Sequence, residues 1–336
     1  MGKPGAAGRI FSSVWATWAV ALVLVGLLAG RATGAPPSNG PAVQLRGSSA
    51  SSDNTKIAVV AAENFWGSIA VQVGGEHVSV HSIITNPDTD PHSYEPTAAD
   101  ARALAEAQFV IVNGVGYDPW VTKLLDANPE PGRVVLTVGD LIGAKEGSNP
   151  HLWYSPDDVQ RVINQIAADY TRIDPSEAHY FDHQRQVYET QGLARYHQLI
   201  ADIRSKYGGT PIGASESIVT PLAKALGLKM ETPESFLDAV SEGTEPSAAD
   251  KITVDRQIKT KQIKIFVFNT QNSTPDVTAL VAEAKANGIP VATVTETLAP
   301  ATATFQQWQV HQLMGIERAL AQSALPQRTL SQVITR

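Results

Sequence analysis

Cysteine is absent from this sequence of 336 residues. Its absence excludes disulfide bonds and thiolate chemistry, so any metal site must use imidazole, carboxylate or carbonyl ligands. A surplus of basic residues is also lacking, because 26 Lys and Arg face 33 Asp and Glu and leave a net charge of -7. Without that surplus, neither nucleic acid nor anionic lipid is expected as the main partner, and a cationic ligand suits the charge better.

A long apolar run occupies residues 14–30, behind the basic residues Lys3 and Arg9. Small residues follow it, as is typical of a secretory signal, so we assign residues 1–35 to a signal peptide that exports the protein. The run is near the short limit for a spanning helix, and an uncleaved membrane anchor is the alternative. Residues 36–55, rich in Pro, Gly and Ser, are predicted to form a flexible linker.

From residue 56 onward, β-branched runs alternate with helical segments, which predicts an α/β fold with parallel sheets covered by helices. The chain length and the 43% hydrophobic content suit two domains. We assign residues 56–174 to an N-terminal lobe, 208–323 to a C-terminal lobe and 324–336 to a tail. The predicted strands are 57–61, 78–84, 109–113, 134–137, 211–214, 263–268 and 291–294, with 229–231 as a further short candidate.

The segment 175–207 between the lobes has the composition of a helix. After Pro175 it contains no proline, and Gly192 is its one glycine before Gly208. It is predicted to form a single helix of about 30 residues, about 45 Å long. A rigid bridge of this kind would limit hinge motion between the lobes.

Two loops place a histidine directly after a proline. His92 lies in NPDTDPHSYEPT (86–97), where three prolines reduce the entropy that the loop loses on ordering. His151 lies in NPHLWYSPD (149–157), just before a predicted helix. Because loops at the carboxyl ends of strands form the ligand crevice in open α/β sheets, both imidazoles are candidate metal ligands. The alternative for each is a solvated loop side chain.

Four stretches in order resemble the extracytoplasmic solute-binding components (cluster A-I) of ABC importers for zinc, manganese or iron. They are residues 86–125, NPHLWYSPDDV (149–159), SESIVTPLAKALGL (215–228) and residues 245–269. The likeness covers about residues 56–320. It implies two Rossmann-like α/β lobes bridged by one long rigid helix, a metal ion held between them, no enzymatic activity, and an ABC-type permease with its ATPase as partner.

The resemblance also implies a ligand set. His92 and His151 match the two histidines of the family's N-terminal lobe, and Glu216 in ASES stands at the place of the third ligand. Glu296 in VTET matches a position that is usually aspartate in a segment resembling FTDS, so the fourth ligand here would be one methylene longer than the usual one. The alternatives are a helix-terminal carboxylate for Glu216 and a solvated loop acid for Glu296.

Two neutral imidazoles and two carboxylates would cancel the charge of a divalent cation, so that the occupied site could be buried. Without the ion, the two acids would repel each other or bind protons, which favours loosening of the lobes. Affinity should fall in acid as the histidines protonate. Nitrogen and oxygen donors suit Mn²⁺ or Zn²⁺, with Fe²⁺ less favoured.

Two other functions fit the same scaffold, namely an exported metal-dependent hydrolase and a metal-binding surface adhesin. His179 and His183 are four residues apart, but Tyr180 stands where a zincin-type motif has its glutamate base, which argues against hydrolysis. Related lipoproteins carry a cysteine after a segment like LLAG, where this chain has Arg31. We therefore expect a monomer without a lipid anchor, either in a periplasm-like space, secreted, or held by an uncleaved helix.

Overall fold

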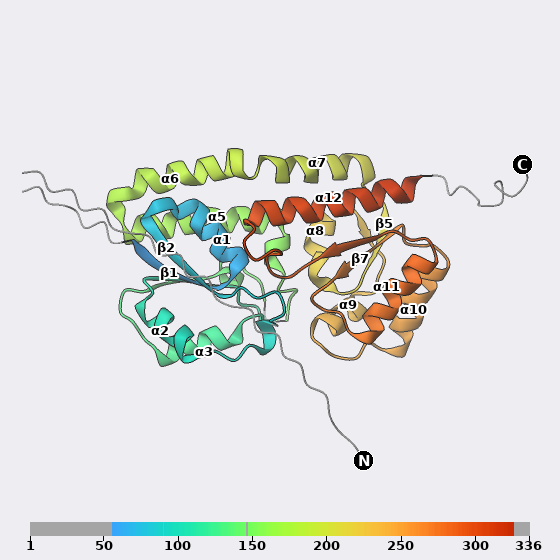
Figure 1. Cartoon of the computed structure of the whole chain (residues 1–336), viewed down its shortest axis with the longest axis horizontal. Coiled ribbons are helices and arrows are strands. Elements are labelled where there is room, and N and C mark those ends of the chain that lie inside the picture. The colour runs from blue at the N-terminus through green and yellow to red at the C-terminus, as the bar shows by residue number, and fades with distance from the viewer. Residues whose placement is uncertain (1–55, 90, 146, 326–336) are drawn as a thin grey trace, which may run out of the picture. The chain divides into compact units, whose positions relative to one another are not determined.

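The computed structural model of the protein describes residues 56–89, 91–145 and 147–325. The predicted signal segment and linker, and the tail beyond Leu325, lie outside the described residues. The described residues belong to one unit, and it contains two four-stranded sheets (Figure 1). None of the helices in the described ranges combines the length and the apolar character needed to cross a membrane.

The N-terminal sheet is parallel throughout and has the strand order β2-β1-β3-β4. Its strands are β1 (Ile57–Glu63), β2 (Val78–Ile84), β3 (Phe109–Val112) and β4 (Val134–Thr137). Val59 and Ala61 of β1 belong to one buried cluster, whereas Val60 and Ala62 belong to another. Both faces of the sheet are therefore covered, as expected for a parallel sheet.

Helices cover each face of the N-terminal sheet (Figure 1). The side chains of α1 (Asn64–Gly74) and α5 (Pro156–Ile173) pack on one face, and those of α2 (Ala98–Glu106) and α3 (Pro119–Ala127) on the other. The short helix α4 (Val138–Ile142) follows β4 directly. Helix α2 begins at the capping box of Thr97 and Asp100, a sequence signal for a helix start.

The C-terminal sheet is also parallel, with the order β6-β5-β7-β8. Its strands are β5 (Pro211–Ala214), β6 (Lys229–Met230), β7 (Ile265–Asn269) and β8 (Val291–Val294). Its helices are α8 (Thr220–Ala225), α9 (Glu234–Ser241), α10 (Ala248–Lys259), α11 (Pro275–Ala286) and α12 (Phe305–Ala324). The predicted α/β class with two parallel sheets is confirmed.

The segment between the sheets differs from the single helix that the sequence predicts. After a 3-10 turn it forms α6 (Ala178–Val187), a π-helical turn at Tyr188–Gly192, and α7 (Ala194–Tyr207). The Tyr188 ring packs over Gly192, where a Cβ atom would lie 2.7 Å from it. The glycine therefore permits a wider turn here, and the bridge is two α-helices joined by this turn.

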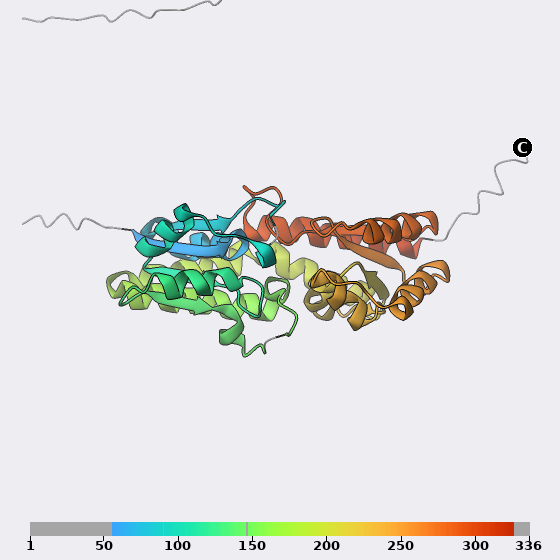
Figure 2. The ribbon, with the colours of Figure 1, turned by 90° about the horizontal axis from the view of Figure 1, so that it is seen from below.

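Helix α12 provides a second connection between the lobes. At its start, the Phe305 backbone N–H donates to Ser68 Oγ of α1 at 2.8 Å, and the helix then packs along α7. Seen from below, the two lobes lie side by side and α12 runs from their boundary along the C-terminal lobe (Figure 2). One buried apolar cluster contains residues of both lobes, so the lobes share a core behind the loops described next.

Candidate metal site

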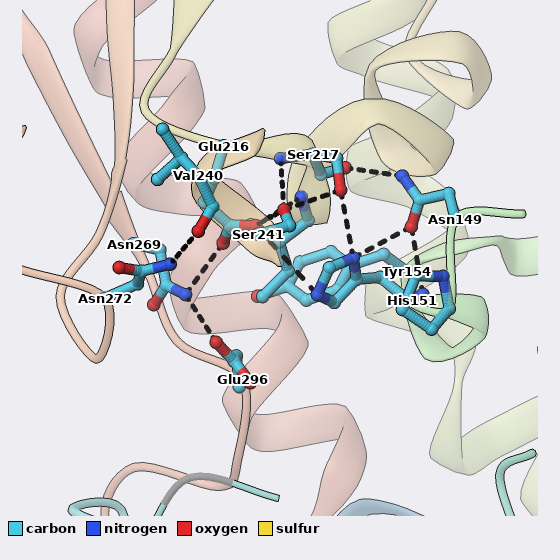
Figure 3. Close-up of polar contacts among 12 residues, drawn as sticks. Asn149, His151, Tyr154, Glu216, Ser217, Val240, Ser241, Asn269, Asn272 and Glu296 are labelled. Carbon is cyan, nitrogen blue, oxygen red and sulfur yellow. Dashed lines mark hydrogen bonds and ion pairs between the residues drawn. The ribbon is translucent and has the colours of Figure 1, made fainter. Parts of the chain in front are cut away.

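Three of the four predicted ligands lie together where loops from the two lobes meet (Figure 3). His151 follows α4, Glu216 follows β5 and Glu296 follows β8, so each lies beyond the carboxyl end of a strand. His151 Nε2 is 4.0 Å from Glu216 Oε2, and one ligand atom from each residue lies within 4.8 Å of the others. With metal–ligand distances of about 2.1 Å, neighbouring ligand atoms of a tetrahedral ion are roughly 3.4 Å apart, so a small contraction of this group would bring the atoms to ligating positions.

Asn149 fixes the orientation of the His151 ring. Its Nδ2 donates to the Ser217 carbonyl at 2.8 Å, which leaves Oδ1 as an acceptor. That oxygen accepts from the His151 backbone N–H at 3.0 Å and lies 2.8 Å from ring Nδ1. A proton on Nδ1 satisfies this contact, and Nε2 then carries the lone pair on the side of the ring that faces Glu216.

Glu216 is fully buried and accepts hydrogen bonds from three groups. Its Oε2 accepts from the Ile218 backbone N–H at 3.1 Å and from Ser241 Oγ at 2.5 Å, and its Oε1 accepts from Asn269 Nδ2 at 2.8 Å. The bond to Ile218 caps the short turn that follows, so the helix-terminal role considered for this acid is real. It coexists with a position facing His151.

The pKa of Glu216 is raised from its usual value to about 7, chiefly by burial and next by the nearby Glu296 carboxylate. The hydrogen bonds from Ser241, Asn269 and Ile218 act in the opposite direction, since they stabilise the charged form. The carboxyl can therefore exist in either protonation state near neutral pH. A cation that replaced the proton would remove the unfavourable burial of the negative charge.

Glu296 contacts both lobes. Its Oε2 accepts from Tyr117 Oη of the N-terminal lobe at 3.0 Å, and its Oε1 accepts from Asn269 Nδ2 at 2.9 Å. Its backbone N–H donates to Gln271 Oε1 at 2.5 Å, and Gln271 Nε2 donates to the Pro87 carbonyl of the opposite lobe. The longer side chain thus places its carboxylate beside Glu216, although the loop differs from the usual family pattern.

Aromatic rings cover the nitrogen side of the site. The Trp153 ring is fully buried, with its centroid 5.3 Å from that of His151 and 4.8 Å from that of Tyr117. Phe65 stacks on Trp153 at 4.0 Å. Burial raises the pKa of the Tyr117 phenol well above its usual value, as does the Glu296 carboxylate, so this hydroxyl is a neutral donor.

His92 is the fourth predicted ligand, and the position of its side chain lies outside the described part of the structure. Its backbone belongs to a 3-10 turn, Pro91–Ser93, whose first carbonyl accepts from Trp120 Nε1 at 3.1 Å. The neighbouring residues Pro87, Thr89 and Pro91 line a cavity of about 500 Å³ together with Glu296. The loop that carries His92 therefore borders the space in front of Glu296.

Sequence reasoning missed the residues that hold the candidate ligands by hydrogen bonds, namely Tyr117, Asn149, Ser241, Asn269 and Gln271. Asn149 precedes the singled-out Pro-His pair, and Asn269 directly follows a predicted strand. Their places beside these features were the signal that could have identified both. Within the described residues, His179 and His183 belong to no group of three metal-binding side chains.

The chain belongs to the family described as zinc-uptake complex component A, periplasmic (ZnuA), whose model matches residues 59–319. Members of this family are extracytoplasmic substrate-binding proteins of metal importers.

Curated relatives include the metal ABC transporter substrate-binding lipoprotein SsaB of Streptococcus sanguinis, which is 26% identical over 67% of this chain and 76% of its own length. The manganese ABC transporter substrate-binding lipoprotein PsaA of Streptococcus pneumoniae is 23% identical over 68% of this chain and 77% of its own. Among solved structures, the Mn-bound periplasmic metal binding protein of Candidatus Liberibacter asiaticus has a TM-score of 0.64 and 21% identity, covering 78% of this chain and 98% of that one. This structural likeness supports the fold.

Proposed function

We propose that this protein captures a divalent transition metal ion in the space between its lobes and delivers it to an ABC permease with its ATPase. The observation that carries the proposal is the convergence of His151, Glu216 and Glu296, from both lobes, within 4.8 Å. His92, on the loop beside them, is the proposed fourth ligand. Membership of a family of metal-importer components supports the same function.

The donor chemistry favours Mn²⁺ or Zn²⁺ as cargo, with Fe²⁺ less favoured. Two carboxylates and two imidazoles neutralise a dication, and oxygen donors reduce the advantage that zinc has at nitrogen-rich sites. Relatives are named for manganese and for iron. The family model, in contrast, is named for zinc. The cargo that we propose is therefore the class of divalent transition metal ions.

We propose that the site binds and releases the ion without catalysis. Catalytic metal sites keep a coordination position open for water or substrate, and four protein ligands would fill a tetrahedral ion. A monomer acting outside the cytoplasm, without nucleic acid, fits this role and the net charge of -7. Relatives are named as lipoproteins, whereas this sequence contains no cysteine for a thioether-linked lipid.

Calorimetric titration of the purified protein with Mn²⁺ and Zn²⁺, with Mg²⁺ as a control, tests the proposal. We expect one ion per chain for each transition metal, reversible by a chelator, and far weaker binding of Mg²⁺, which imidazole ligands do not suit. Absence of a one-to-one complex with either transition metal would reject the proposed function. Native mass spectrometry with elemental analysis then identifies the ion carried in the protein's own compartment.

A further inference from the structure

A single side-chain amide connects the two carboxylates of the proposed site. Asn269 ends β7 and is fully buried. Its Nδ2 donates to Glu216 Oε1 at 2.8 Å and to Glu296 Oε1 at 2.9 Å (Figure 3). The two N–H groups of the amide are thus divided between two acids that come from different loops.

The orientation of this amide follows from its other contacts. Asn269 Oδ1 accepts from the Gln271 backbone N–H at 3.0 Å, and the Asn269 backbone N–H donates to Ser215 Oγ at 3.1 Å. If the amide were flipped, its oxygen would face two carboxylates and its nitrogen would face a backbone donor. The contacts therefore require that Nδ2 point at the acids.

We propose that Asn269 is a positioning residue for metal capture, holding Glu216 and Glu296 at ligating separation before the ion arrives. The inference rests on the proposed function. Two carboxylates in a buried site repel each other strongly because the surrounding dielectric is low. The shared donor offsets part of this repulsion and engages Oε1 of each acid, and the other oxygen of Glu216, Oε2, is the one that faces His151.

Replacement of the amide would leave each acid with fewer restraints. Glu216 would keep Ser241 and its own turn, and Glu296 would keep Tyr117. Neither remaining set joins the two carboxylates directly. We therefore expect the acids to separate in the metal-free protein, and part of the binding free energy would be used to bring them together again.

The test compares Asn269→Leu, which is close in shape and has no donor, with Asn272→Leu. Asn272 lines the cavity beside Glu296, but its Nδ2 donates to the Val240 carbonyl. Loss of a hydrogen-bond partner of a metal ligand typically weakens affinity by about 10–100-fold. We expect that loss of Mn²⁺ and Zn²⁺ affinity in Asn269→Leu, with a shifted visible spectrum of bound Co²⁺, and neither change in Asn272→Leu.

A double-mutant cycle separates positioning from general damage. If Asn269 acts through the acids, Asn269→Leu should weaken binding much less in a Glu296→Ala background than in the wild type. Equal losses in both backgrounds would overturn the positioning role. Thermal unfolding without metal verifies that the variant folds, and if it does not, Asn269→Ser, which can donate to one acid at most, replaces it in the cycle.

The outcomes distinguish the two hypotheses. If the wild-type protein binds neither metal, the proposed function fails. If it binds metal and Asn269→Leu binds equally well with an unchanged Co²⁺ spectrum, only the role of Asn269 fails.

Discussion

The two lobes repeat one sheet topology, and the register of their central strands allows a position-by-position comparison. In the N-terminal sheet, Val59 of β1 pairs with Phe109 of β3. In the C-terminal sheet, Ile212 of β5 pairs with Ile265 of β7. In both sheets, one further strand lies on each side of this central pair. Residues at equal distances from these two pairs therefore occupy equivalent places in the two lobes.

Four residues after each of these positions, both lobes have an acid at or just beyond the end of the first strand, and an asparagine at or just beyond the end of the second. They are Glu63 and Asn113 in the N-terminal lobe, and Glu216 and Asn269 in the C-terminal lobe. All four side chains are buried. The same pair of residue types thus stands where the two central strands end.

The contacts of these two pairs differ. In the C-terminal lobe, Asn269 donates to Glu216. In the N-terminal lobe, Asn113 Oδ1 accepts from Trp66 Nε1, and its Nδ2 donates to the Pro150 carbonyl at 2.9 Å, beside His151. Neither oxygen of Glu63 has a hydrogen-bond partner on another described residue.

The comparison teaches what makes a buried acid available to a cation. Burial raises the pKa of Glu63 well above its usual value, and so does the charge of Asp118, so this side chain is expected to be a neutral acid. Glu216 is equally buried, but three donors favour its charged form and an imidazole faces it. Position in the fold is therefore insufficient, and the surrounding donors decide which buried acid can carry the negative charge that a metal ligand needs.

The largest expected effect comes from the same substitution at the two equivalent acids. Glu216→Gln removes a proposed ligand, so we expect Mn²⁺ and Zn²⁺ affinity to fall by more than the loss of about 100-fold that marks the upper end for outer-shell partners. Glu63→Gln replaces a neutral carboxyl with a neutral amide of similar shape and should leave affinity almost unchanged. Calorimetric titration of both variants measures this, and comparable losses in the two would refute the contrast between the lobes.

The N-terminal lobe contributes nitrogen ligands in this scheme, and alanine substitutions test that division. His151→Ala and His92→Ala should each abolish tight binding, because each change removes one nitrogen donor from the proposed set of four ligands. His183→Ala, on α6, is the matched control and should bind as the wild type does. Equal affinities in all three variants would contradict the ligand assignment. A loss confined to His151→Ala would remove His92 from the set.

A pH series should show opposite trends for metal affinity and metal-free stability. The pKa of Glu216 is about 7 in the folded protein against 4.5 for an exposed glutamate, and that of Glu63 is raised too. The stability that each protonated acid contributes is fully present below the pKa of the unfolded state. The contribution of Glu216 is lost as pH rises through about 7. We therefore expect the metal-free unfolding temperature to fall between pH 5 and pH 8.

Metal affinity should rise over the same range, by up to about tenfold per pH unit below 7, because the ion must displace the proton from Glu216. The measurements are thermal unfolding in chelator and titrations at matched ionic strength. Glu63→Gln provides the control. It should make the unfolding temperature depend less steeply on pH and leave the pH dependence of metal affinity unchanged. A metal-free protein that becomes more stable from pH 5 to pH 8 would contradict the predicted sign.

Much of the fold could be predicted from sequence because buried parallel strands form short β-branched runs between clear helix starts. The runs at β2, β4, β5 and β8 coincide with the observed strands. The π-helical turn could not be predicted, since it depends on how Tyr188 packs over Gly192. Nor could the equivalence of the lobes, because the repeat lies in strand register and the residue sequences share little beyond FVIVN and IFVFN.

The candidate site divides in the same way. His151, Glu216 and Glu296 lie in conspicuous motifs, and the structure brings them together. Asn113 and Asn269 are ordinary residues at strand ends, and their importance comes from contacts with loops that are distant in sequence. Sequence patterns identify groups that can bind an ion, whereas the side chains that orient those groups become visible only in three dimensions.

The smallest expected effect concerns the contact in which the N-terminal lobe meets the acids of the other lobe. Tyr117 Oη donates to Glu296 Oε2, and burial keeps the phenol pKa high enough for it to remain a donor across the physiological range. Tyr117→Phe preserves the ring packing and removes this donor, while Asn269 continues to hold the other oxygen. We expect metal affinity to fall by up to about tenfold, at the low end for outer-shell partners.

Tyr170→Phe makes the same chemical change at another buried tyrosine, since Tyr170 Oη donates to the Ala70 carbonyl at 3.1 Å within the N-terminal lobe. It should not alter affinity, because neither residue belongs to the metal-binding group. Stopped-flow measurement of metal release into excess chelator should show a faster rate for Tyr117→Phe alone. If both variants release metal at the wild-type rate, the cross-lobe hydrogen bond contributes nothing to retention, and the acids are held by their own lobe.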